Sequence, residues 1–322
     1  MNLDQILQQA AMSGALRCDA AESVLFARDL EHIYSRAYDI LYPELRARQL
    51  VPPAPEPASP VDDKITYRQF NYVASSQPGA DYSDDAPLSD VFGKEFSIKV
   101  RPVTGAYKYS IAELRASRQH NFPLDMHRAR ATRTGIETEI DRVILLGDSR
   151  FGIEGLFNHS SVDQADVADD GAAASKLWTE KTPQLIKRDI LEPINKMVSD
   201  SKGVERGPWT CVLPISAYQL IHQTQIQDSL RETIAQWLLS QIPQLAGFEM
   251  HHYCADIGTS SEGRMVLYTR NPEKVHYHVP QEFEQLPPEA RGFTFNVNCH
   301  ARTAGIMLPY PKSIAYRDRI TA

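Results

Sequence analysis

Histidines and cysteines in the last third of the chain come closest, in type and spacing, to a metal site. They lie on or beside expected strands: His251, His252, Cys254, His276, His278, Cys299 and His300. His276 and His278 would point to one face, because alternate residues of a strand do so. Zinc is held by imidazole and thiolate groups, but no standard spacing of zinc ligands is met. We therefore expect strand histidines on a solvated or subunit-facing surface, with no metal and no cofactor.

Three carboxylates, Glu137, Glu139 and Asp141, are the best candidates for acid–base catalysis. They are interleaved with Arg133 and Arg142 along an expected helix, where ion pairs on a solvated face are the ordinary arrangement. The sequence holds no GxSxG, GxxxxGKS/T, GxGxxG or HExxH motif, and each of these would mark a known catalytic or phosphate-binding site. We therefore expect no catalytic residue and no enzyme.

One pattern of charge extends over two expected helices. The only acidic residues near these positions are Glu113 and Asp125. The basic residues that gather there are Arg115, Arg118, His120, His127, Arg128, Arg130 and Arg133. An expected loop at residues 75–90 has no basic residue and four acidic ones: Asp81, Asp84, Asp85 and Asp90. Charged residues of both kinds, the basic ones on the helices and the acidic ones in the loop, ordinarily lie on solvated surfaces. The alternative is that the acidic loop of one copy lies on the basic helices of the next, where weak ion pairs set the register of an assembly and apolar contacts supply the affinity.

The composition limits the classes of protein. With 322 residues, 42% of them hydrophobic, the chain can bury a large core and form about two domains. A net charge of −7 argues against a surface dedicated to nucleic acid. The hydropathy and the first residues lead us to expect neither a membrane span nor a secretory signal. Its four cysteines are far apart, so we expect free thiols in a reducing cytosol and no contact with a membrane.

The elements that must position these residues begin with a helical arm. Apolar residues recur at three- and four-residue steps up to about residue 50, which predicts a helix. Residues 51–60 then contain five prolines, which favour a stiff, extended strap. Strand patterns follow over residues 65–73 and 96–109. They predict a long hairpin that cannot stabilise itself and rests on something else.

Helices and strands are mixed in the rest of the chain. Ser110 and Glu113 fit a capping box, and a longer helix is expected over residues 123–146, with a bend or a close contact at Gly135. Further helices are expected at residues 182–197, 215–221 and 230–242, and strands at 209–214, 248–254, 265–269, 275–279, 293–299 and 304–308. Residues 163–175 read as a flexible acidic loop. The irregular alternation of helices and strands predicts an α+β fold.

Four short runs occur in order over residues 64–162: ITY at 65–67, VTGAYKYSIAEL at 103–114, LLGD at 145–148 and GIEGLFN at 152–158. In order and spacing this stretch resembles the major capsid proteins of tailed bacteriophages, which have the Hong Kong 97-type fold. The resemblance implies a phage capsid fold with five parts. They are an N-terminal arm and Pro-rich strap (1–61), an extended β-hairpin loop (62–109), a peripheral domain with a long spine helix (110–175), an axial domain (176–265) and C-terminal strands of the peripheral domain (266–322).

The resemblance also implies a function. Copies of a phage or prophage major capsid protein self-assemble through pentamers and hexamers into an icosahedral head around double-stranded DNA, which they contact non-specifically. Such a virion protein is assembled in the bacterial host cytoplasm, with scaffold, portal and decoration proteins as possible partners. The short arm implies a separate scaffold protein or none. An acidic chain suits this role, because a lumen that bound DNA tightly would impede packaging and ejection.

Two other classes of protein remain open. An encapsulin-like compartment shell has the same fold and would hold cargo enzymes instead of DNA. A soluble α+β enzyme would require a deep pocket lined by residues such as His251, His276 and His300. Some relatives of the capsid family cross-link a loop lysine to an asparagine of a neighbour, but we do not predict this chemistry for Lys94.

Overall fold

The computed structural model describes residues 43–76, 88–119, 124–172, 175–227 and 230–321. The chain divides into two units, Met1–Glu44 and Leu45–Ala322, and every described element belongs to the second. The expected N-terminal helix lies outside the described residues except for its last part, where α2 (Ala47–Leu50) is found. Of the helices in these described ranges, none has the length and apolarity that a bilayer span requires.

The proline-rich strap packs against the body of its own chain. Leu50 and Val51 are buried in the core. The backbone N–H of Tyr277 donates to the carbonyl of Pro52 (3.1 Å), and the N–H of Ala54 donates to the carbonyl of Tyr277 (3.1 Å). Because proline has no N–H to continue such a ladder, the pairing stays short. The strap is thus fixed at its start and extended beyond it.

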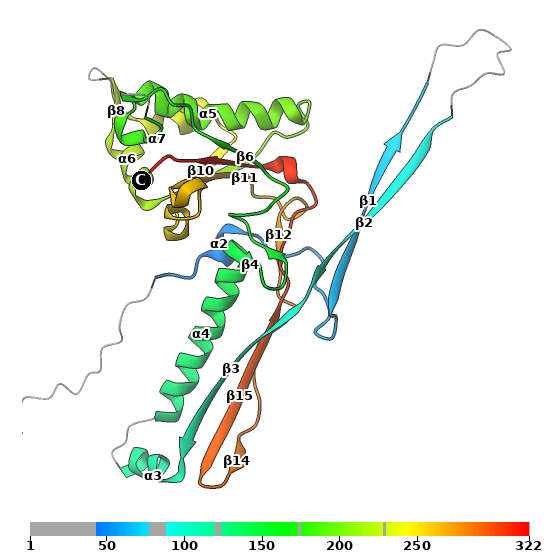
Figure 1. The fold of residues 1–322 in the computed structure, drawn as a ribbon, viewed down its shortest axis with the longest axis vertical. Helices are drawn as coiled ribbons and strands as arrows, with labels where there is room; N and C mark the ends of the chain where they lie inside the picture. Colours follow the sequence, from blue (N-terminus) through cyan, green and yellow to red (C-terminus); the bar gives the residue numbers. More distant parts are fainter. Residues whose placement is uncertain (1–42, 77–87, 120–123, 173–174, 228–229, 322) are drawn as a thin grey trace, which may run out of the picture. The chain divides into compact units, whose positions relative to one another are not determined.

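Two long strands, β1 (Lys64–Val73) and β2 (Asp90–Lys99), form an antiparallel hairpin and are paired along their whole length (Figure 1). A hairpin is predicted from the sequence, but its second strand is residues 90–99 instead of 96–109. The chain leaves the hairpin at the buried residue Val100. The next strand, β3 (Arg101–Ser110), pairs instead with β15 (Thr294–Thr303) near the end of the chain. Within the described ranges the hairpin strands therefore have no third strand beside them.

A helical segment follows β3. The capping box that begins α3 (Ile111–Gln119) is confirmed: the Ser110 hydroxyl accepts from the N–H of Glu113 (3.1 Å), and the Glu113 carboxylate accepts from the N–H of Ser110 (2.9 Å). The long helix α4 (Leu124–Leu146) lies alongside β3 and β15 (Figure 1). It ends at Gly147, whose φ of +74° suits glycine.

A five-stranded mixed sheet forms the centre of the other half. Its strands, in spatial order, are β10 (Leu245–Met250), β7 (Trp209–Leu213), β11 (Arg264–Thr269), β17 (Ile314–Asp318) and β6 (Asp163–Asp166). Three helices pack on it: α5 (Pro183–Asp200), α6 (Ile215–Gln223) and α7 (Ile234–Gln241). Every residue of β7, β11 and β17 is buried, as expected for strands covered on both faces.

Two hydrophobic cores meet at this sheet. Side chains that alternate along its strands point to opposite faces. Val212 and Val266 belong to the core that includes α4 and the strap, whereas Cys211 and Leu267 belong to the core under α5, α6 and α7. The three described cysteines are buried and free. The sheet thus joins the two cores into one body.

Short strands complete the fold. They are β4 (Gly147–Asp148) with β5 (Ile153–Glu154), β8 (Gln225–Gln227) with β9 (Leu230–Thr233), and β12 (His276–His278) with β16 (Gly305–Met307), while β13 (Gln281–Gln285) and β14 (Glu289–Arg291) pair with β15. This mixture of helices with mainly antiparallel strands confirms the predicted α+β class.

Four local predictions were wrong. Residues 230–233 are a strand, because Thr233 is the N-cap of α7 and forms a capping box with Gln236. Residues 163–166 are an edge strand, since they pair in parallel with β17. The strand expected at residues 248–254 ends at Met250, and a 3₁₀ turn follows. The strand expected over residues 96–109 is divided at Val100, and only its first part belongs to the hairpin. Of the bend or close contact expected at Gly135, the close contact is not found, because a Cβ there would have no atom within 4 Å.

Candidate assembly surfaces

His276 and His278 do lie on one face of a strand, with ring centroids 5.0 Å apart. Both are buried, so the expected solvated or subunit-facing position is wrong. The His276 Nδ1 is 2.6 Å from the Pro272 carbonyl oxygen, and burial lowers the pKa of His278 to about 4. In the parts of the chain that the structure describes, no three His, Cys, Asp or Glu side chains gather as metal ligands would.

The other histidines are held by local contacts. His251 stacks on His252, with ring centroids 4.6 Å apart, and burial lowers its pKa to about 4. His300 Nε2 lies 3.0 Å from the side-chain nitrogen of Gln281. Among the described residues, His251, His276 and His300 do not form a group that could hold a metal ion.

The three helical carboxylates of α4 serve structure in two ways. Glu137 pairs with Arg48 (3.2 Å) and Glu139 with Arg142 (2.6 Å), which confirms the prediction of ion pairs. Asp141 differs, because it is buried and accepts the N–H of Ala47 (2.7 Å). Burial raises the pKa of Asp141. This carboxylate therefore fixes the entry of the strap instead of lying on a solvated face.

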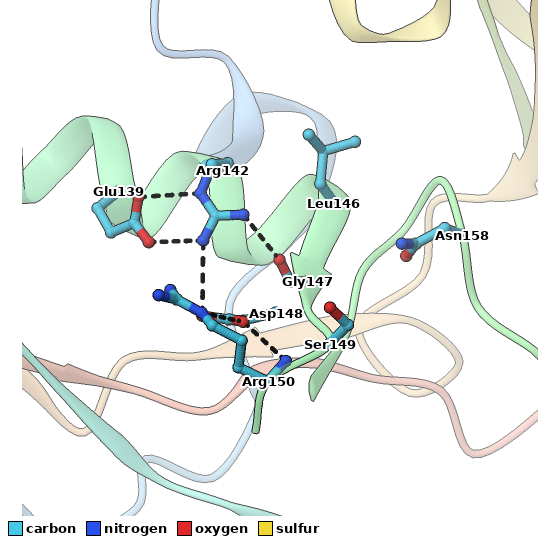
Figure 2. Close-up of a pocket in the computed structure, with 8 residues that line it drawn as sticks. All are labelled: Glu139, Arg142, Leu146, Gly147, Asp148, Ser149, Arg150 and Asn158. Atoms are coloured by element: carbon cyan, nitrogen blue, oxygen red, sulfur yellow. Dashed lines mark hydrogen bonds and ion pairs between the residues drawn. The ribbon is translucent and has the colours of Figure 1, made fainter. Parts of the chain in front are cut away.

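A polar pocket of about 470 Å³ lies at the end of α4 (Figure 2). Arg142 donates to Glu139 and to the Gly147 carbonyl (3.2 Å), and Arg150 pairs with Asp148 (2.7 Å). Hydrogen bonds from Arg150 lower the pKa of Asp148. Arg142 also lies 3.7 Å from Asp148, so the two arginines share that carboxylate. The network stiffens the turn after α4.

The predicted basic cluster is partly neutralised within the chain. Arg128 pairs with Glu113 (2.9 Å) and donates to the Lys108 carbonyl (2.6 Å). These hydrogen bonds lower the pKa of Glu113 to about 2. Arg133 lies over the ring of Phe283, 5.7 Å from its centroid. Arg115 is exposed.

Several members of the predicted contact lie outside the described residues. They are the acidic residues Asp81, Asp84 and Asp85 and the side chain of Arg118. Arg130 makes an interaction within the chain. Asp90 begins β2 and is exposed, and its carboxylate accepts the N–H of Val91 (2.7 Å). The contact between acidic loop and basic helices therefore stays a prediction.

Apolar side chains are exposed on the hairpin. They are Phe70, Tyr72, Val73, Leu88, Val91, Phe92 and Phe96, each at least 41% accessible. Cross-strand partners share a face, so Phe70, Tyr72 and Val91 lie on one face, whereas Phe96 stacks with Tyr67 on the other (5.2 Å). An apolar ribbon of this kind is typical of a surface that binds another protein. The sequence predicts the hairpin, and its strand register assigns the faces.

A second pocket, of about 590 Å³, lies at the base of the hairpin and was missed in the sequence. Its lining residues are Asp63, Lys64, Lys99, Val100, Arg101, Pro102 and Arg302. They come from three segments far apart in the chain, which only the pairing of β1 with β2 and of β3 with β15 brings together. In the sequence, the only sign of this pocket is the pair Lys64 and Lys99, which lie at the start of β1 and at the end of β2.

Solved structures that are similar to this chain include a phage capsid, the capsid of a GTA particle and a virus-like particle. The capsid of Myoviridae phage XM1 matches with a TM-score of 0.79 at 16% identity, covering 92% of this chain and 99% of that one. The capsid of a native GTA particle matches with a TM-score of 0.63 at 10% identity, covering 94% and 99%. A virus-like particle from Pyrococcus furiosus matches with a TM-score of 0.50 at 10% identity, covering 84% and 91%. No curated protein matches in sequence.

The sequence itself supports the same assignment. The family model described as "Major capsid protein" matches residues 77–320. This range includes β2, the spine helix α4, the five-stranded sheet and the C-terminal strands. The resemblance to capsid proteins seen in the sequence is therefore confirmed, and the chain belongs to the major capsid protein family.

Proposed function

We propose that this major capsid protein self-assembles through pentamers and hexamers into an icosahedral phage head that encloses double-stranded DNA. The observation that carries the proposal is the hairpin: it has exposed aromatic and aliphatic side chains on both faces and no third strand among the described residues. Such a ribbon is poorly stabilised in one copy and gains apolar contacts in an assembly.

The parts of the chain then have separate tasks. The arm and strap (1–61) and the extended loop (62–109) reach toward neighbouring copies, the loop through its hairpin strands β1 and β2, whereas β3 stays in the body, paired with β15. The peripheral domain (110–175), completed by the C-terminal strands (266–322), forms the body of the shell around α4. The axial domain (176–265) gathers around the five- and six-fold axes. The protein acts as structure, without catalytic residues and without a cofactor.

Packaged DNA is contacted non-specifically, and the net charge of −7 keeps that contact weak. Shells form in the bacterial host cytoplasm and become part of the virion. Scaffold, portal and decoration proteins are the further partners that a head of this kind uses.

The acidic loop and the basic helices form one contact between copies. In this proposal Asp81, Asp84, Asp85 and Asp90 of one copy lie near Arg115, Arg118, Arg128, Arg130 and Arg133 of the next. Arg115, an exposed member of the basic set, supports it, while Arg128 contributes less because Glu113 already pairs with it.

Reversal of Asp81, Asp84 and Asp85 to Lys tests this contact. The variant subunit keeps its fold, because these residues lie between the hairpin strands, but shells form in lower yield or with altered geometry. The matched control reverses three other exposed acidic residues, Asp169, Asp256 and Glu273, with the same change in charge. Unchanged shell yield and unchanged salt response in the triple Asp variant would contradict the contact.

An encapsulin-like compartment is the alternative function, and the similarity to a virus-like particle favours keeping it. The contents of purified particles decide between the two. Nuclease-protected DNA of phage length supports a head, whereas a bound enzyme without DNA supports a compartment.

Sizing of the purified recombinant chain, followed by negative-stain electron microscopy, tests assembly itself. Closed shells, rings of five or six copies, or sheets are expected. A monodisperse monomer or dimer at all concentrations, with or without a scaffold protein, would contradict the proposal.

A further inference from the structure

Two lysines stand directly opposite each other at the base of the hairpin. Lys64 and Lys99 are register partners at the end of the β1–β2 ladder, so their side chains lie on the same face. Both are exposed. Neither has a carboxylate within 4.0 Å among the residues that the structure describes. Like charges directly opposite on a ladder are destabilising, so this arrangement has a cost in the isolated subunit.

Two arginines extend the positive charge into a pocket. Arg302 pairs with Asp63 and donates to the Pro60 carbonyl. Arg101 lies over the ring of Phe151, 5.1 Å from its centroid, and its Nε is buried without a hydrogen-bond partner. Four cations and one carboxylate thus line the pocket, which gives it a formal charge of +3 in a chain of net charge −7.

The same face of the hairpin becomes apolar farther from the base. Beyond the lysines come the paired Arg68 and Glu95 (2.8 Å), and then Phe70, Tyr72 and Val91, which are exposed. Nucleic acid is bound along extended basic surfaces by its phosphates. A confined positive pocket beside an apolar strip instead matches a protein surface with an acidic group next to apolar side chains.

We infer that the pocket formed by Lys64, Lys99, Arg101 and Arg302 is a carboxylate-binding site that receives acidic side chains of a second copy of this chain. The inference rests on the proposed assembly. The chain supplies the ligand, since it has 41 acidic residues against 34 basic ones. Binding would remove the repulsion between Lys64 and Lys99 and would anchor the base of the hairpin while its apolar strip packs on the same neighbour.

Charge reversal measures the effect on assembly. In the Lys64→Glu/Lys99→Glu variant we expect the yield of shells to fall about tenfold or more, as for the loss of close charge pairs at an interface. The control, Lys202→Glu/Lys312→Glu, makes the same change of charge at exposed lysines outside both the hairpin and the pocket and should assemble like the wild type. Circular dichroism and thermal unfolding of the unassembled subunits check that both variants fold.

Zero-length cross-linking identifies the ligand directly. Particles are assembled from an equal mixture of ¹⁵N-labelled and unlabelled chains and treated with a carbodiimide, which joins amines to carboxylates in contact. We expect mixed-isotope peptides that join Lys64 or Lys99 to an Asp or Glu. Cross-links only within one copy, for example to Asp63, would overturn the inference. So would a reversal variant that assembles normally but retains less DNA, because the pocket would then bind phosphate.

Failure of assembly can be told apart from failure of this site. If the wild-type chain forms no particles, the proposed function fails, and the same cross-linking of the concentrated soluble chain still decides whether the pocket meets a second copy. If particles form and the reversal variant matches the wild type in yield, only the carboxylate site is wrong.

Discussion

Arg264 and Asp318 form a buried ion pair between neighbouring strands of the five-stranded sheet. Two hydrogen bonds of 2.6 and 2.8 Å join them, and the side chains are only 5% and 0% accessible. Arg264 also donates to the Phe157 carbonyl (2.7 Å), and Asp318 accepts from Thr259 and Gln164. Every charge has partners, so the pair ties the loop after α4 to the C-terminal strand.

Removal of the arginine should therefore be costly. Arg264→Met leaves a buried carboxylate without its cation, and we expect the free energy of unfolding to fall by about 3–5 kcal/mol. The control Arg68→Met breaks the exposed pair with Glu95 and should cost less than about 1 kcal/mol. Urea unfolding of the unassembled subunit measures both. Equal losses in the two variants would contradict the role assigned to burial.

Glu113 gives a prediction of pH dependence. The hydrogen bonds from Arg128 lower its pKa from 4.5 to about 2 in the folded chain. A carboxyl with a depressed pKa stabilises the fold fully above its unfolded pKa and loses that contribution as the pH falls through the folded pKa. The pairing of α3 with α4 should thus weaken between pH 4.5 and 2.

Carboxyl NMR of the unassembled subunit can follow this titration. Glu113 should titrate near pH 2, and Arg128→Gln should move its pKa back toward 4.5, because the hydrogen bonds from Ser110 alone remain. A wild-type pKa near 4.5 would mean that the ion pair is not formed in solution.

At the scale of elements, the hairpin is paired along its whole length but exposes its apolar side chains. Phe70→Ser with Tyr72→Ser removes side chains that are 54% and 72% accessible in the single chain. We expect the stability of the subunit to change by less than about 0.5 kcal/mol for each residue, while the yield of shells falls strongly. Val204→Ser with Tyr310→Ser, at residues that are 80% and 52% accessible and lie outside the strap and the hairpin, is the control and should affect neither. A loss of subunit stability without a loss of assembly would show that the hairpin packs on its own chain.

Elements with local signals were predictable from the sequence. Ser110 with Glu113 located the start of α3, and Gly147 located the end of α4. Thr233 with Gln236 carried the same kind of signal for α7, but the apolar pattern before it concealed the boundary. The edge strand at residues 163–166 is mostly polar without alternation, and it forms by pairing with β17, where Lys196 and Arg317 also pair with Asp163. Long-range contacts of that kind leave no local pattern.

The candidate sites could likewise be predicted from the sequence only in part. The basic residues of the two helices could be listed from the sequence, but only the structure shows that Arg128 already forms an ion pair with Glu113. The pocket at the base of the hairpin could not be found, because Arg302 is brought to Lys64 and Lys99 by strand pairing across the whole chain. Spacing likewise predicted that His276 and His278 share a face, but their burial depends on what packs over them.

At the scale of the whole molecule, the two cores and the exposed hairpin divide the chain by task. The cores on either side of the five-stranded sheet stabilise one subunit. The hairpin, with its apolar strip and basic pocket, contributes little to either core. The hairpin exposes apolar side chains that have no partner within one subunit. These side chains become buried when many copies pack together, which is the physical reason to expect a shell.

Cryo-electron microscopy of particles assembled from the full chain tests this account most directly. We predict closed shells with five-fold axes, in which the hairpin of each copy lies on a neighbouring copy, its apolar strip is covered and its basic pocket contacts acidic side chains. Particles in which the hairpin stays exposed to solvent or folds back on its own subunit would contradict the central claim.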